Sequence, residues 1–139
     1  MTLSIRNQLP GTVTEVQPGE VMATIKIRLD GGQDLMAAIT LEAVEQLGLA
    51  PDSRVHALVK STEISLATNR VEGLSIRNQL PGAIVQIALG GAMASVKVSV
   101  ADGELTAVIT KDATEELGLF VGSDVVALIK ATEVALASA

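Results

Sequence analysis

The nonapeptide LSIRNQLPG occurs twice in this chain, at residues 3–11 and again at residues 74–82. Nine identical residues in a chain of 139 indicate an internal duplication, and a repeat of this kind constrains the fold more than any other feature. Aligned on the nonapeptide, the two halves keep an offset of 71 residues up to about Gly32 and of 70 afterwards. We therefore expect two copies of one domain, at 1–69 and 73–139, with a short linker at 70–72 inside the polar stretch TNRVEG.

The composition of each copy describes a small, ordered unit. Hydrophobic residues make up 48% of the chain and charged residues 19%, which argues against disorder. The apolar residues are mainly Ala, Val, Ile and Leu, with one Phe and no Tyr or Trp. A domain of roughly 70 residues without large aromatics buries little surface, so we expect oligomerisation to supply more.

Several classes of function are disfavoured by residues that the chain lacks. It has no cysteine, which excludes disulfides and thiolate metal sites. Its net charge of −6 argues against nucleic acid as a partner, although a few local donors can still hold a small anion. The single histidine, His56, becomes Val126 in the other copy, and there is no phosphate-binding glycine loop, so an enzyme is not expected. No apolar run reaches membrane-spanning length, and we expect a cytoplasmic protein without a membrane partner.

Apolar residues in each half follow the period of two that is typical of strands. Between residues 21 and 29 the inward positions are expected to be Val21, Ala23, Ile25, Ile27 and Leu29. Further strands are expected at 12–17, 35–39, 55–60 and 63–67, with copies at 83–88, about 96–100, 105–109, 125–130 and 133–137. The nonapeptide itself is interpreted as a strand with Leu3 and Ile5 pointing inward, followed by a turn at Pro10-Gly11.

Turns and helix caps separate these strands. Turns are expected at residues 18–19, 90–91, 30–32 and Asp102-Gly103. One short helix in each half is expected to begin at Thr40 and Thr110, where an N-cap hydroxyl precedes an acidic first turn, and to end at Gly48 and Gly118. The predicted fold is mainly β, with two tandem OB-like five-stranded β-barrels, each carrying one short helix.

Polar residues that occur in both copies are candidates for the function of the repeat. In an extended strand Ser4 and Arg6 share one face, and a hydroxyl beside a guanidinium suits a tetrahedral oxyanion. Asn7 lies beside them and either donates to a ligand or braces the turn. The copies of these residues are Ser75, Arg77 and Asn78. The alternative is a surface arginine paired with a carboxylate.

Two further elements offer donors to an anion. Thr40 and Thr110 stand at helix N-termini, although plain N-capping is a sufficient explanation for both. Lysines at the end of a strand precede a possible backbone donor, at Lys60-Ser61 and Lys130-Ala131; here the alternative is a solvated strand end. Because Ser61 is replaced by Ala131, its hydroxyl cannot be essential in both copies. Lys26 and Lys97 are interpreted as solvent-facing.

The order of these motifs, SIRNQLPG before a strand, IT at a helix start and KST or KAT at a strand end, resembles the molybdate-binding Mop (TOBE-type) domain. Two such domains in one chain resemble the di-domain molbindins. The resemblance implies a homotrimer of OB-like barrels that binds molybdate or tungstate at interfaces between domains and subunits, without direct coordination of the metal by protein side chains. It also implies the oxyanion-binding residues, which are Ser4, Arg6, Asn7, Thr40, Lys60 and Ser61, and Ser75, Arg77, Asn78, Thr110, Lys130 and Ala131.

The predicted function is therefore cytoplasmic binding, storage and homeostasis of molybdate. Regulators and transporters of the family join this domain to a DNA-binding or ATPase domain, and neither is recognisable in this sequence, which favours storage. Two alternatives stay open: an OB-fold protein that binds nucleic acid, disfavoured by the single Phe120 and the acidic balance, and a purely structural oligomerisation module.

Overall fold

The computed structural model describes residues 2–101 and 103–139, so the predicted turn residue Asp102 lies outside the described residues. The first half contains β1 (Asn7–Pro18), β2 (Met22–Leu29), β3 (Asp34–Thr40), α1 (Leu41–Leu47), β4 (Arg54–Val59), the 3-10 turn η1 (Ser61–Glu63) and β5 (Ile64–Ala67). The second half repeats this order with β6 (Asn78–Leu89), β7 (Met93–Val100), β8 (Gly103–Thr110), α2 (Lys111–Glu116), β9 (Asp124–Ile129), η2 (Ala131–Glu133) and β10 (Ala135–Ser138).

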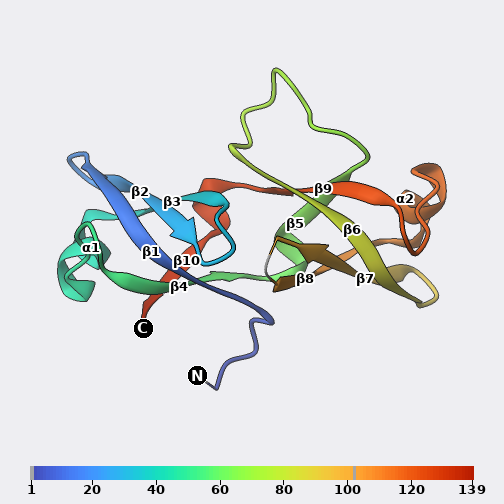
Figure 1. Cartoon of the computed structure of the whole chain (residues 1–139), viewed down its shortest axis with the longest axis horizontal. Helices are drawn as coiled ribbons and strands as arrows, with labels where there is room; N and C mark the ends of the chain where they lie inside the picture. Colours follow the sequence, from blue (N-terminus) through green and yellow to red (C-terminus); the bar gives the residue numbers. More distant parts are fainter. Residues whose placement is uncertain (1, 102) are drawn as a thin grey trace.

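The strands form two five-stranded antiparallel sheets that exchange their last strands. The strand orders are β10-β4-β1-β2-β3 and β5-β9-β6-β7-β8. Thus β10 of the second repeat pairs with β4 of the first (Ala135 opposite Leu58), and β5 of the first repeat pairs with β9 (Ile64 opposite Ile129). Figure 1 shows β10 in the lobe that holds β1 to β4, and β5 in the other lobe. The mainly β, OB-like fold is confirmed, but each sheet combines four strands of one sequence repeat with one strand of the other.

Strand β2 shows how the period of two builds the core. Ala23, Ile25, Ile27 and Leu29 are buried, whereas the residues between them are exposed. The prediction for Val21 is wrong, because its side chain is 73% exposed and the strand begins one residue later. The hairpin closes through a bond of 2.8 Å from the N–H of residue 19 to the carbonyl of residue 22, which places Val21 inside the turn.

The nonapeptide is a strand only from Asn7 onward, and the turn predicted at Pro10-Gly11 is wrong. Leu3 lies before the strand and is 40% exposed. Gly11 continues β1, pairing with Leu29 on β2 and with β4 on the other side. The glycine is needed because β2 passes so close: a Cβ on Gly11 would lie 2.7 Å from Ile27 Cγ2.

Both helices begin where the sequence predicted. The Thr40 hydroxyl oxygen accepts a hydrogen bond from the Ala43 N–H, and the Thr110 hydroxyl oxygen accepts one from Ala113, both at 3.1 Å. Gly48 follows α1 directly with φ of +62°, the left-handed conformation in which glycine is favoured. In the described part of the chain, neither helix has the length and apolar character needed to cross a membrane.

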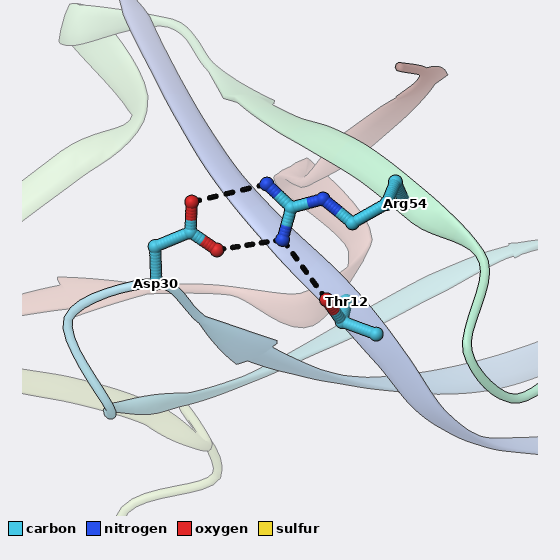
Figure 2. A network of polar contacts seen from close by, with 3 residues as sticks. All are labelled: Thr12, Asp30 and Arg54. Carbon is cyan, nitrogen blue, oxygen red and sulfur yellow. Dashed lines mark hydrogen bonds and ion pairs between the residues drawn. The ribbon is translucent and has the colours of Figure 1, made fainter.

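One polar network distinguishes the first lobe from the second. The Arg54 guanidinium donates to both carboxylate oxygens of Asp30, at 2.7 and 3.0 Å, and to the Thr12 hydroxyl at 2.9 Å (Figure 2). The hydrogen bond from Arg54 and its charge hold the pKa of Asp30 below its usual value. In the second repeat Ala83 and Asp124 align with Thr12 and Arg54, so this contact has no copy there.

Candidate functional site

Two exposed arms carry the predicted serine and arginine donors. Ser4 and Arg6 lie in the segment before β1, and Ser75 and Arg77 in the segment before β6. All four side chains are exposed, and none belongs to a strand, so the shared strand face assumed from the sequence is not present. Within the described residues, the recorded ion pairs involve other cations, which leaves both guanidinium groups facing solvent.

The asparagines that follow these arginines are placed quite differently. Asn7 and Asn78 are 2% and 3% exposed, respectively, at the first residue of β1 and β6. The side chain of Asn7 is hydrogen-bonded to the backbone of Thr106 on β8, and that of Asn78 to the backbone of Met36 on β3. Their amides are thus engaged with protein backbone, whereas the neighbouring arginines are accessible.

Arg77 lines an open hollow of about 570 Å³ between the two repeats. Lys26 and Arg28 of β2 contribute further positive charge to this hollow. Each has an acidic neighbour, with Lys26 Nζ 3.2 Å from Glu15 and Arg28 Nε 2.5 Å from Asp34. The Arg28 pair uses only Nε, so the two Nη groups keep their donors.

Neither Lys26, interpreted above as solvent-facing, nor Arg28 is among the anion donors that the sequence predicts. The available signal was their spacing, since two cations separated by one residue on a strand share its outer face. The hollow also contains Asn78 but neither Thr40 nor Lys60.

Thr40 and Lys60 lie at the ends of β3 and β4, and Thr110 and Lys130 at the ends of β8 and β9. Lys60 is exposed and lines a second hollow with Ile5, which lies between Ser4 and Arg6, and with Ile39, which precedes Thr40. Thr132 and Glu133 of η2, which belong to the other repeat, complete one wall. The structure therefore brings Lys60 close to the neighbours of Arg6 and Thr40.

The 3-10 turns place their predicted residues alike in both repeats. Ser61 and Ala131 are half-buried at the start of η1 and η2. The carbonyls of Lys60 and Lys130 each accept a hydrogen bond of 2.9 Å from the glutamate N–H three residues later. Among the described residues, no group of three or more His, Asp or Glu side chains forms a metal-binding cluster.

The chain matches known proteins along its whole length. The TOBE domain model matches residues 3–66 and again 74–136. A solved structure of the cytoplasmic molybdate-binding protein ModG, with molybdate bound, superimposes with a TM-score of 0.97 and 39% identity, covering 100% of both chains. The chain belongs to the TOBE family as a di-domain molbindin.

Other relatives match this chain over one or both repeats and differ from it in length. The molybdenum transport protein ModE of Azotobacter vinelandii is 38% identical over 138 residues, and the molybdenum-pterin-binding protein MopB of Rhodobacter capsulatus is 39% identical over 136 residues. The chain spans about half the length of these two relatives (51% and 50%). The molybdenum-pterin-binding protein 2 of Clostridium pasteurianum is 36% identical over 66 residues, or 97% of its own length, and so corresponds to a single repeat.

Proposed function

We propose that this di-domain molbindin binds molybdate, and tungstate as its close analogue, and stores it in the cytoplasm without catalysing a reaction. The observation that carries the proposal is the superposition on molybdate-bound ModG, because it aligns both repeats and the whole chain at a TM-score of 0.97. The relatives above are named for molybdenum binding or transport, which is consistent with a binding role.

The chemistry of the exposed arms supports an intact oxyanion as the ligand. A guanidinium donates in a planar fork with full positive charge, and charge-assisted bonds of this kind are among the strongest in proteins. Arg6 and Arg77 are exposed and each has an exposed serine two residues before it, so both arms carry a charged donor and a hydroxyl donor. Such donors bind the oxygens of molybdate, and no protein side chain needs to coordinate the metal.

We further propose that the binding sites are completed at interfaces between domains and subunits of a homotrimer. The hollow of Arg77 holds neither Thr40 nor Lys60, so the proposed donors of one site are separated within a single chain. Asn7 and Asn78 adjoin these sites, and Thr110, Lys130 and Ala131 would supply the facing side for one class of site. Because Ala131 lacks the hydroxyl of Ser61, the two classes should differ in affinity.

Isothermal titration of the intact protein with molybdate, tungstate and sulfate tests this function. We expect tight binding of molybdate and tungstate and weaker binding of sulfate. Replacing both arginines (Arg6→Ala with Arg77→Ala) should weaken molybdate binding by about tenfold to a hundredfold, because a hydrogen bond to a charged group contributes about 1.5–3 kcal/mol. Arg54→Ala removes the same charge outside both hollows and serves as the control.

Two results would overturn the proposal. The first is the absence of heat with molybdate, or equal binding of molybdate and sulfate. The second is a trimer, seen by native mass spectrometry, whose melting temperature does not change with molybdate, since a ligand that binds the folded state must raise it. That second result would favour a purely structural module.

A further inference from the structure

The asparagine of each nonapeptide forms a two-bond contact with a strand of the other repeat. Asn7 Nδ2 donates to the Thr106 carbonyl at 2.9 Å, and Asn7 Oδ1 accepts from the Thr106 N–H at 2.8 Å. Reciprocally, Asn78 Nδ2 donates to the Met36 carbonyl and Oδ1 accepts from its N–H, both at 2.8 Å. We call these two contacts the amide clasps. Each side chain replaces the pair of backbone bonds that a neighbouring strand would make.

The clasps lie on strands that, within the described residues, have no hydrogen-bonded strand on one side. β3 and β8 are the terminal strands of their sheets, so one row of their backbone groups is not paired within the sheet. Asn7 and Asn78, which are themselves buried, satisfy one N–H and one carbonyl of these rows at half-buried residues. Leaving a buried polar group without a partner is unfavourable, so the clasped arrangement is preferred.

The Asn7 amide has no donor left for a ligand. Besides Thr106, its Nδ2 donates to the Val59 carbonyl at 3.0 Å, which uses both of its N–H groups. An amide engaged in this way is suited to position its neighbours. The residue before each clasp is an arginine of the proposed oxyanion site, and the arm that carries it has no regular secondary structure.

Each clasp also fixes the arm against a strand that carries another proposed donor. Asn78 is bound to β3, which ends at Thr40, and Asn7 is bound to β8, which ends at Thr110. The distance between the clasp and the threonine is four residues in both strands. The residue after each arginine is thereby bound to the strand of the other repeat that ends at a proposed threonine donor.

We propose that Asn7 and Asn78 are positioning residues, which hold the Arg6 and Arg77 arms in register with the strands that end at Thr110 and Thr40 and so set the affinity of each class of oxyanion site. This inference rests on the proposed function. The asparagines act on the oxyanion indirectly, through the arginines that precede them and the strands of the opposite repeat to which they are bound. Their contact with the bound oxyanion is not required.

Single variants of the full-length protein, Asn7→Ala and Asn78→Ala, test the proposal with two readouts. Backbone hydrogen exchange, measured without ligand, should become faster at Thr106 in the first variant and at Met36 in the second. Molybdate titration should show about tenfold weaker binding at one class of sites and unchanged binding at the other. Both are measured far below the melting temperature, so that the protein stays folded.

The core variant Val55→Ala is the matched control, because Val55 is fully buried (0% exposed) and its truncation lowers stability away from the clasps. Should the alanine variants not fold, Asn7→Ser and Asn78→Ser keep one polar group at the buried position and serve as milder versions.

The outcomes separate the possible roles of the asparagines. Faster exchange with unchanged molybdate affinity would make the clasps purely structural and overturn the proposal. An equal loss of affinity in Val55→Ala would also overturn it, because lower stability would then be the cause. If the wild-type protein itself does not bind molybdate, the proposed function fails and the positioning role fails with it. The exchange data then describe only the hydrogen bonds between the asparagines and the opposite repeat.

Discussion

Gly82 offers a direct test of why the nonapeptide ends in Pro-Gly. The structure places this glycine inside β6, opposite Val100 on β7. A Cβ at this position would lie 2.4 Å from the Ser99 carbonyl oxygen and 2.7 Å from Val98 Cγ1. The φ of Gly82 is not positive, so its lack of a side chain matters here through space and not through backbone conformation.

The expected cost of Gly82→Ala follows from these contacts. Ordinary contacts of a Cβ begin at 3.4 Å, so the carbonyl of Ser99, which is part of the β6–β7 ladder, would have to move. Forcing an extra carbon into a packed site costs about 1–3 kcal/mol, and the contact with backbone places this case at the upper end. Replacing glycine by alanine also raises the free energy of unfolding by about 0.5–1 kcal/mol, because alanine restricts the unfolded chain. We therefore expect a net loss of about 2 kcal/mol, or roughly 6 °C in melting temperature.

Urea unfolding at pH 7 measures this loss, and two other glycines calibrate it. Gly11→Ala should behave like Gly82→Ala, since its Cβ would lie 2.8 Å from the Arg28 carbonyl oxygen. Gly91→Ala is the control, because within the described residues no atom beyond its chain neighbours lies within 4 Å of its Cβ. It should be neutral or stabilise slightly. If Gly82→Ala unfolds at the same urea concentration as Gly91→Ala, the close approach of β6 and β7 is not the reason for the glycine.

Three further predictions concern the caps, the ion pair and the exchanged strand. The alanine variants of Thr40 and Thr110 should each lose about 1 kcal/mol, since each hydroxyl caps a helix; an unchanged urea midpoint would contradict the capping. The pKa of Asp30 is lowered by its hydrogen bond with Arg54, so the pair stabilises the fold above the pKa of an unfolded aspartate, about 3.9, and loses this effect as the pH falls through the lower folded value. Wild type and Arg54→Ala should thus differ in stability at pH 7 and converge in acid, and a difference independent of pH would refute the pairing. Val134→Ala, buried beside β10, should cost roughly 2 kcal/mol and speed hydrogen exchange in β4 of the opposite repeat, which would stay protected if the strands were not exchanged.

Local signals were sufficient for much of the fold. Alternating apolar residues predicted β2, and a hydroxyl before an acidic turn predicted the first residue of both helices. The same local signals failed at Pro10-Gly11, because Pro-Gly is typical of turns and a strand approached closely by its neighbour needs glycine as well. Only the position of β2 distinguishes the two cases.

The candidate site was likewise predictable from the sequence only in part. The sequence indicated which residues are shared by both repeats, and in the structure Arg6 and Arg77 are exposed. The sequence could not distinguish these exposed arginines from Asn7 and Asn78, which are also polar and also occur in both repeats. Their burial depends on strands far away in the sequence, since Asn78 is bound to Met36 and Asn7 to Thr106, with sequence separations of 42 and 99.

By itself, the sequence determined the duplication, the strand periods and the helix caps, because each depends on residues a few positions apart. The exchange of β5 and β10 was decided only by the tertiary structure. The two repeats are so similar that a short last strand has equivalent partners in β4 and β9, and no local pattern distinguishes them. Contacts between residues far apart in the sequence, among them the amide clasps, join the two repeats, and a pattern of a few neighbouring residues does not encode them.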